Sequence, residues 1–330
     1  MTQAPSPRRR GFSLWRIAAA GLALAGTAHA ADYPNKPIML VIPYAAGGFA
    51  GMLGQMIGEK MGADLGQPVV MDYRAGANGN LAARYVAGAP ADGYTVLLGT
   101  SSGLAINPNL YEKLPFDPVK DFKPVAQLIT APNVVVVSAQ SDIHSIGELI
   151  AQAKAAPGTI TFGSSGIGSS MHLSGEMFKT RTNTKMLHVP YKGSAAALTD
   201  LIGRQITVMF SDTTALPHVK AGKLRALAVT STKRVASIPD VPTVAQAGVP
   251  GFAVESWYGL FVPAKTPNAT VLRIHRAAAA AMADASIRAR LLELGSPPAP
   301  DMSPAHLSRT LQSDVKQWAA VVKESGAKAE

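Results

Sequence analysis

Short apolar runs alternate along the chain with longer segments whose apolar residues recur every three or four positions. The short runs are bounded by turn residues and read as strands, whereas 145–156, 170–180 and 194–203 have the period of helices. This succession predicts an α/β fold with largely parallel sheets. The predicted strands are 38–43, 69–72, 95–99, 134–138, 160–163, 186–189, 206–210, 224–230 and 257–262.

The number of strands predicts two lobes. Nine strands with their covering helices are more than one parallel sheet comfortably holds in a chain of 330 residues. The C-terminal part is helical without strands, over 268–294 and 303–323, with the breaking sequence SPPAP between the two segments. We expect this helical block to pack back on the first lobe.

Residues 1–30 have the pattern of a secretory signal peptide, with basic residues, a short apolar middle and the small-x-small sequence AHA at 28–30. Cleavage is expected before Ala31. Arg9 and Arg10, followed by Gly-Phe, also fit a twin-arginine signal, so the Sec and twin-arginine routes both stay open. Either route predicts a protein exported to the periplasm.

Composition removes several classes of function. The formal charge of +10 includes four arginines of the leader; without them, 27 basic and 21 acidic residues leave +6, scattered without the basic stripe of a nucleic-acid-binding protein. The chain has no cysteine, which excludes disulfides, zinc thiolate sites and cysteine nucleophiles. The histidines show no metal-ligand spacing, so we predict no metal and no cofactor. No apolar run after the leader is long enough to span a bilayer.

The sequence LVIPYAAGGFAG at 40–51 runs from a strand through a glycine loop into a helix that begins near Ala50. Glycines let a ligand approach the backbone, and a helix start offers unpaired N–H donors with a partial positive charge. The loop is neither a P-loop nor a dinucleotide fingerprint. A site for an anion and a tight structural turn are both open readings.

A second loop of the same kind lies in ITFGSSGIGSSMHLSGEMF at 160–178. Here Ser164, Ser165, Ser169 and Ser170 add hydroxyls to the backbone donors, and one of the last two is expected to cap the helix. Two such loops favour an anion site over a structural turn.

These serines raise the alternative of an exported hydrolase that uses Ser165 or Ser169 with His172. A nucleophile elbow would need glycine at position 167, where Ile167 stands. His172 reads better as a partly buried histidine bonded to backbone than as a catalytic base. We therefore assign no catalytic residue.

Polar residues also follow other predicted strands. In open α/β sheets ligands bind beyond the carboxyl ends of the strands, so these residues are expected at one crevice. Lys192 and Asp212 fit solvated surface charges equally well. The residues are Thr100, Ser101, Tyr191, Lys192, Ser194, Ser211 and Asp212.

Ordered blocks over the mature chain closely resemble the exported solute-binding proteins of tripartite tricarboxylate transporters, the Bug family. The blocks include YPNKPIMLVIPYAAGG, GQPVVMDYRAGANGN, PADGYTVLLGT, INPNLYEKLPFDPVKDFKPVAQL, HVPYKGSAAALTDLIGRQITVMF, AGKLRALAVTSTKR, IPDVPTVAQAGVPGF and SWYGLFVPAKTP.

The resemblance implies a two-lobed periplasmic-binding-protein fold, type II-like, with a ligand cleft between two mainly parallel sheets. Lobe 1 would comprise 32–131 plus 257–330, and lobe 2 would comprise 132–256. The protein would be a monomer that captures a small carboxylate and delivers it to integral-membrane subunits of a tripartite tricarboxylate-type transporter. A ligand-sensing receptor of a signalling system is the alternative.

The resemblance also implies ligand-binding residues. The first loop would grip a carboxylate, the opposing lobe would contribute the second loop, and residues at other strand ends would line the crevice. In that order these are Tyr44, Ala46, Gly47, Gly48 and Phe49; Ser164, Ser165, Gly168, Ser169 and His172; and Thr100, Ser101, Tyr191 and Asp212.

The first loop departs from the family pattern at two places. The family usually has an acidic residue in GGxxD, where this chain has Gly51. We expect that end of the pocket to tolerate more negative charge or to be roomier. Ala45 and Ala46 replace the usual prolines, which predicts a less rigid loop.

Overall fold

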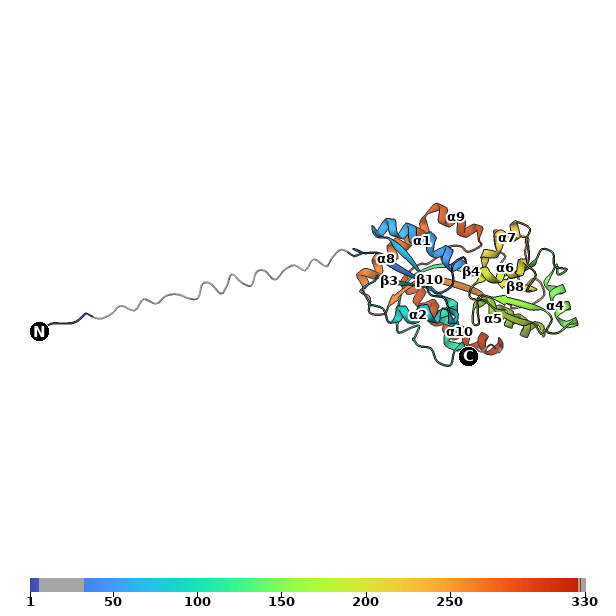
Figure 1. Ribbon diagram of the computed structural model, residues 1–330, viewed down its shortest axis with the longest axis horizontal. Helices are drawn as coiled ribbons and strands as arrows, with labels where there is room; N and C mark the ends of the chain where they lie inside the picture. The colour runs from blue at the N-terminus through green and yellow to red at the C-terminus, as the bar shows by residue number, and fades with distance from the viewer. Residues whose placement is uncertain (6–32, 326, 328–330) are drawn as a thin grey trace.

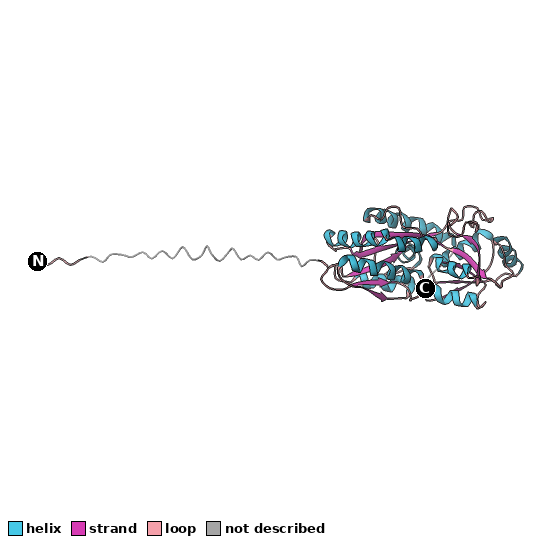
Figure 2. Cartoon of the chain, turned by 90° about the horizontal axis from the view of Figure 1, so that it is seen from above, coloured by secondary structure: helices cyan, strands magenta, loops and turns pink. Residues whose placement is uncertain are grey.

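The computed structural model describes residues 1–5, 33–325 and 327. The predicted leader, 1–30, therefore lies outside the described residues except for its first five. Two five-stranded sheets, each with helices on both faces, form two lobes that lie side by side (Figures 1 and 2). No helix in the described part of the chain is long and apolar enough to cross a membrane.

Within the described residues, ten strands and ten helices carry the fold, together with three short helical turns. The strands are β1 (Ile38–Ile42), β2 (Val69–Tyr73), β3 (Thr95–Thr100), β4 (Phe122–Pro132), β5 (Val134–Ser138), β6 (Thr161–Ser164), β7 (Leu187–Pro190), β8 (Val208–Ser211), β9 (Leu224–Val229) and β10 (Glu255–Pro263). The helices are α1 (Phe49–Leu65), α2 (Asn80–Ala87), α3 (Asn107–Leu110), α4 (Ile146–Ala155), α5 (Ser170–Thr182), α6 (Ser194–Ile202), α7 (Leu216–Lys220), α8 (Asn268–Ala283), α9 (Ala285–Glu293) and α10 (Pro304–Ser325). The short turns are η1 (Ala77–Gly79), η2 (Ser102–Ile106) and η3 (Thr213–Ala215).

Both sheets have the same plan. The first has the order β2-β1-β3-β10-β4 and the second β7-β6-β8-β5-β9. In the first sheet only β10 runs against the other strands, and in the second only β5 does. Four of five strands in each sheet thus share one direction, and the prediction of mainly parallel sheets is confirmed.

The chain passes between the sheets twice. It leaves the first sheet at Pro132, the end of β4, and enters β5 at Val134, with only Asn133 between them. It returns from β9 through 230–254 to Glu255, the start of β10. Each reversed strand is the first one after a crossing. The two crossings bring Asn133 and Ser256 to the junction of the lobes.

Two predictions of secondary structure are wrong. The strand β4 was not expected, because Pro124 and Pro132 interrupt its pattern. Among the described strands it pairs only with β10 and so lies at the edge of its sheet, where proline is tolerated. The single helix predicted over 268–294 is two helices, α8 and α9, because Asp284 adopts an extended ψ of 130° and its carboxylate accepts hydrogen bonds from the first turn of α9.

Successive residues of a strand point to opposite faces of its sheet, and the hydrophobic core is divided accordingly. In β3, Val96 and Leu98 face the cluster built with α1, α8 and α9, whereas Leu97 faces the cluster built with α2 and α10. Both faces of the sheet are thereby covered, which is why its strands are apolar almost throughout.

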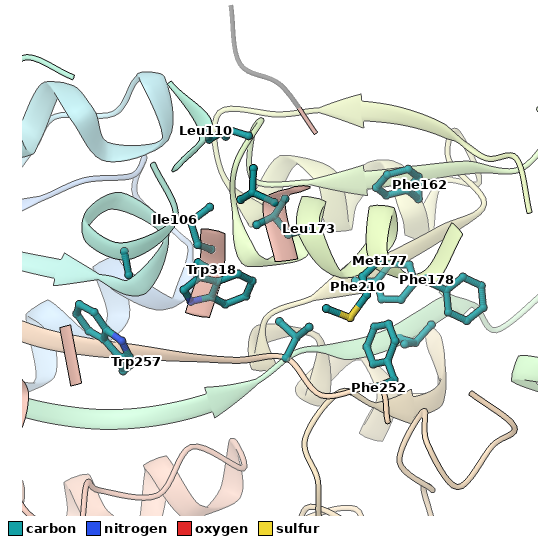
Figure 3. Close-up of a cluster of buried hydrophobic side chains, with 14 of the residues drawn as sticks. Ile106, Leu110, Phe162, Leu173, Met177, Phe178, Phe210, Phe252, Trp257 and Trp318 are labelled. Carbon is teal, nitrogen blue, oxygen red and sulfur yellow. The ribbon is translucent and has the colours of Figure 1, made fainter. Parts of the chain in front are cut away.

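One buried cluster continues from the first lobe into the second. Figure 3 shows Ile106 of η2 and Trp257 of β10, both in the first lobe, in the same cluster as Phe162 and Phe210 of the second sheet. The helix α10 contributes Trp318 to this cluster and packs against β4, η2 and α5. The C-terminal helix therefore packs on the first lobe, as expected, and contacts the second lobe as well.

Candidate functional site

The first glycine loop ends at the N-terminus of α1, which faces the other lobe. Gly47 has φ +89°, a conformation that favours glycine, and the N-cap residue Gly48 has no side chain to offer the first-turn N–H groups. A Cβ on Gly48 would lie 3.1 Å from Ser194 Oγ of the second lobe. The loop thus brings the first-turn N–H groups of α1 against the opposite lobe, where the Phe49 N–H meets Asp212.

The second loop ends at the N-terminus of α5 in the same region. Ser169 is the N-cap and accepts a hydrogen bond from the His172 N–H at 3.2 Å, as predicted for one of the two serines. The next N–H, that of Ser170, donates across the lobe junction to Ser102 Oγ at 3.1 Å. Gly168, with φ +83°, lets the loop approach the first lobe closely.

Two further elements of the second lobe start at this place. The helix α6 begins at Ser194 after Gly193, which has no side chain for a cap. Asp212 caps η3, since its Oδ1 accepts the Thr214 N–H at 3.1 Å and the Thr214 hydroxyl. The N-termini of three helices, α1, α5 and α6, therefore converge from both lobes.

These elements enclose a small cavity, the first cavity, with a volume of about 30 Å³. A second cavity of about 300 Å³ adjoins it, and Tyr44 and Ser165 line both. The first is lined by Tyr44, Gly48, Phe49, Ala50, Ser102, Ala131, Pro132, Asn133, Ser165, Ser170, Met171, Gly193, Ser194, Asp212, Ser256 and Tyr258. The second is lined by Tyr44, Gly76, Ala77, Asn78, Tyr111, Ser165, Gly166, Ile167, Pro190, Tyr191 and Lys192.

The structure brings part of the predicted site residues to these cavities. Six line one or both of them: Tyr44, Gly48, Phe49, Ser165, Tyr191 and Asp212. The other eight line neither cavity: Ala46, Gly47, Thr100, Ser101, Ser164, Gly168, Ser169 and His172.

Several of these eight support the lining residues. Thr100 Oγ1 lies 3.3 Å from the Tyr44 hydroxyl, and Gly168 donates its N–H to His172 Nδ1 at 3.1 Å, which shapes the second loop. Ala46 and Gly47 are exposed. The Ser101 hydroxyl is fully buried without a hydrogen-bond partner among the described residues.

Sequence reasoning did not single out other lining residues, among them Asn78, Asn133, Ser256 and Tyr258. Asn133 and Ser256 lie at the two crossings between the lobes. The end of β4 was the signal that would have located Asn133, and that strand was not recognised.

Gly51 does not enlarge the site, so the expectation of a roomier pocket is wrong. The ring of Tyr73 lies beside it, with Cε1 3.2 Å from where a Cβ would stand. The acidic group near the start of α1 comes instead from the opposite lobe, where Asp212 faces the Phe49 N–H.

The first cavity has one carboxyl group and no basic side chain among the described residues. Burial raises the pKa of Asp212, and donors from Thr214, Ser194 and the Phe49 N–H offset part of that rise. Burial also raises the pKa of Tyr44 and that of Tyr258, which keeps both as hydroxyl donors. Lys192 lines only the second cavity.

The second loop does not have the geometry of a serine hydrolase. The Ser169 hydroxyl donates to the Gly166 carbonyl at 2.7 Å, and His172 uses Nδ1 to accept the Gly168 N–H. Burial lowers the pKa of His172 to about 3, so it is neutral and bonded to backbone, as the favoured reading predicted. His188 stacks on it and binds the Ser164 hydroxyl at 2.7 Å. No cluster of side chains suited to a metal ion occurs in the described part of the chain.

Comparisons with family models and with solved structures agree on one family. The family model described as tripartite tricarboxylate transporter family receptor matches residues 54–327. Among solved structures, the periplasmic binding protein BugD is 33% identical, with a TM-score of 0.87 over 90% of this chain and 100% of its own. The R. palustris protein Rpa4515 with adipate is 36% identical, with a TM-score of 0.87 over 90% and 99%. MatC (Rpa3494) from Rhodopseudomonas palustris with bound malate is 31% identical, with a TM-score of 0.84 over 88% and 100%.

Proposed function

The chain belongs to the tripartite tricarboxylate transporter receptor family, and from this premise we propose that it captures a small organic carboxylate between its lobes and delivers it to the membrane subunits of a transporter of that type. Family members are binding receptors and not enzymes. The observation that carries the proposal is the convergence of three helix N-termini, from both lobes, on one cavity. Two relatives were solved with adipate and with malate, which supports a carboxylate as ligand.

Neutral donors are sufficient for such a ligand. Phe49, Ala50, Ser165 and Ser170 line the first cavity and offer backbone N–H groups and hydroxyls, of which the Phe49 N–H also faces Asp212. A hydrogen bond to a charged group contributes roughly 1.5–3 kcal/mol. About four of them reach the roughly 8 kcal/mol of micromolar binding before the cost of ordering the ligand.

The ligand would extend from the first cavity into the second, past Tyr44 and Ser165. In this arrangement the six predicted residues that line the cavities contact the ligand, and the other eight hold the loops in place. We keep the predicted division into lobe 1, 32–131 plus 257–330, and lobe 2, 132–256. Lobe closure would then exclude water from the carboxylate.

Delivery to a transporter requires export, so we also propose a periplasmic monomer whose leader is cleaved before Ala31. Mass spectrometry of the protein purified from the periplasm should give an N-terminus at residue 31. Light scattering should give the mass of one chain. An N-terminus within the predicted leader, or a dimer, would contradict this part of the proposal.

The primary test is a thermal-shift screen of the protein against mono-, di- and tricarboxylates, with the corresponding amides as uncharged controls. A ligand at about 100 times its Kd stabilises the folded chain by roughly 2.7 kcal/mol, which raises the melting temperature clearly. The sample is first extracted under denaturing conditions to detect a co-purified acid. A protein free of such an acid that responds to no carboxylate would refute capture.

A pair of serine variants locates the ligand. Ser165→Ala removes a hydroxyl that lines both cavities, and affinity for the acid found in the screen should fall about tenfold or more. Ser101→Ala makes the same change at a fully buried hydroxyl outside the cavities and should leave affinity unchanged. Uptake of the labelled acid by cells that lack the gene tests delivery, since it should fall to background.

A further inference from the structure

A further cavity lies where the second crossing between the lobes meets α10. This hinge cavity has a volume of about 330 Å³, and its walls come from β4, from 253–257 and from α10. Among the described residues, Ser256 alone lines both the hinge cavity and the first cavity. An occupant of the hinge cavity would therefore contact the segment that joins the lobes, outside the space assigned to the carboxylate.

Two carboxyl groups line the hinge cavity. Neither Glu255 nor Asp314 forms an ion pair with another described residue. Asp314 Oδ2 accepts the Trp257 indole N–H at 2.6 Å, which leaves Oδ1 for another donor. Burial raises the pKa of both carboxyl groups, and at Asp314 the indole N–H offsets part of that rise.

The protein supplies no cation to these carboxylates. Of the described residues that line the hinge cavity, none is lysine, arginine or histidine. Lys233 and Arg234 line a neighbouring cavity that Glu255 also borders, but the Arg234 guanidinium donates to Gln246 Oε1 at 2.9 Å and to the Pro239 carbonyl at 3.0 Å. A positive charge in the hinge cavity would thus have to come from an occupant.

Gln127 adds an acceptor that the described residues do not use. Its side chain is 4% exposed, and Oε1 has no hydrogen-bond partner, whereas Nε2 donates to Thr130 Oγ1 at 3.3 Å. Gln127 pairs with Gly259, where an added Cβ would meet Leu307 of α10, so the Gln127 side chain lies on the sheet face that α10 covers. An N–H group of an occupant would satisfy this buried oxygen.

The remaining feature of the hinge cavity is aromatic. Trp257 of β10 and Trp318 of α10 line it, and both belong to the buried cluster of Figure 3. Indole rings attract organic cations, and carboxylates bind N–H donors of a cation in charge-assisted hydrogen bonds. We propose that the hinge cavity binds a small organic cation with N–H donors, a protonated amine or a guanidinium, whose charge is held by Glu255 and Asp314. This site is distinct from the cleft and does not depend on capture of a carboxylate.

The tryptophans provide a direct readout. The chain has three, of which Trp15 lies in the predicted leader and the other two line the hinge cavity. The mature chain is titrated with butylammonium, butanediammonium and guanidinium at constant ionic strength and about pH 7, where alkylammonium groups are charged. Intrinsic fluorescence and calorimetry should both show saturable binding of at least one of them. Tetramethylammonium, a cation without N–H donors, should bind at least tenfold more weakly, and neutral butanol should not bind.

Variants of the two carboxyl groups locate the cation. Asp314→Asn keeps an oxygen that can accept the Trp257 N–H, and Glu255→Gln keeps the side-chain length; each should weaken binding of the cation about tenfold or more. Asp142→Asn, at an exposed loop position of the second lobe, changes the net charge equally and should leave binding unchanged. Melting curves of the free variants establish that each one is folded.

Four results would overturn the proposal. They are no saturable binding of any of the three cations, equally tight binding of tetramethylammonium, unchanged affinity in Asp314→Asn or in Glu255→Gln, and a loss of affinity in Asp212→Asn, which would place the cation in the first cavity. None of them bears on capture of a carboxylate, which the thermal-shift screen tests separately.

Discussion

Gly168 is the residue whose replacement most directly tests contact between the lobes. It has φ +83°, and a Cβ at this position would lie 2.4 Å from Leu110 Cδ2, 3.0 Å from Asn78 Nδ2 and 3.2 Å from Asn107 Oδ1. Gly168 belongs to the second loop, whereas these three residues belong to the first lobe. Gly168→Ala therefore adds backbone strain within one lobe and a steric conflict between the two.

The two effects have different sizes and different consequences. Left-handed backbone costs a non-glycine residue roughly 1–2 kcal/mol in any arrangement of the lobes, so the free energy of unfolding should fall by about that amount. Overpacking of a close contact costs typically 1–3 kcal/mol, and this cost applies only when the lobes are in contact. If ligand binding requires that contact, affinity should fall roughly 5- to 150-fold.

The assay is calorimetric titration of the acid found in the screen, together with urea unfolding of the free protein. Gly158→Ala is the matched control, because Gly158 has φ +84° and nothing within 4 Å of its added Cβ. It should lose similar stability and keep its affinity. Leu110→Ala combined with Gly168→Ala should recover affinity relative to Gly168→Ala alone, without recovering stability. Unchanged affinity in Gly168→Ala, or an equal loss in Gly158→Ala, would refute the reasoning.

Other predictions concern the second loop and the junction with α10. Burial holds the pKa of His172 at about 3 and that of His188 at about 4, against 6.5 when unfolded, so the unfolded chain takes up protons that the folded chain refuses. The free energy of unfolding should be highest above pH 6.5 and should fall toward pH 4 by up to about 1.4 kcal/mol per pH unit per histidine. Melting temperatures at pH 7 and pH 5 measure this loss. The drop between the two pH values should be smaller in His188→Phe, which has one of the two histidines fewer. Ser169→Ala should lower the free energy of unfolding by about 1 kcal/mol through loss of the α5 cap, and no change in urea unfolding would contradict that role. Trp257→Phe removes the indole donor 2.6 Å from Asp314 Oδ2 and should cost about 1–3 kcal/mol, whereas a value near zero would show that water replaces it.

The sequence was most informative where one physical signal dominated. Strands buried on both faces are almost wholly apolar, as in β5 (VVVVS), and such runs were located to within about two residues. The strand β4 was not predicted because its prolines allow pairing on one side only. Whether a strand lies at the edge of a sheet depends on the tertiary structure and cannot be read from the local sequence. The break at Asp284 was hidden by the strong helical pattern on both sides of it.

The site was predictable where a strand runs directly into a glycine or serine loop. That local signal located Gly48, Phe49 and Ser165, which line the first cavity. It also selected residues such as Ser164, whose hydroxyl turns to His188 and away from the cavity. Asn133 and Ser256 escaped because their position depends on where the chain crosses between the lobes, which no local pattern encodes.

The place of β10 between β3 and β4 has a consequence for the order in which the molecule assembles. The strand β4 has no partner in its sheet other than β10, and residues 133–254 separate the two along the chain. The second sheet is built from one continuous segment and can form first, as domains with local connectivity do. Once formed, it shortens the effective loop that β10 must close, which reduces the entropic cost of that closure. Docking of β10 is then the step of highest contact order, and until it occurs β3 and β4 present unpaired edges. A chain truncated before residue 255 would consequently contain a folded second lobe and an unfinished first lobe that is prone to aggregate.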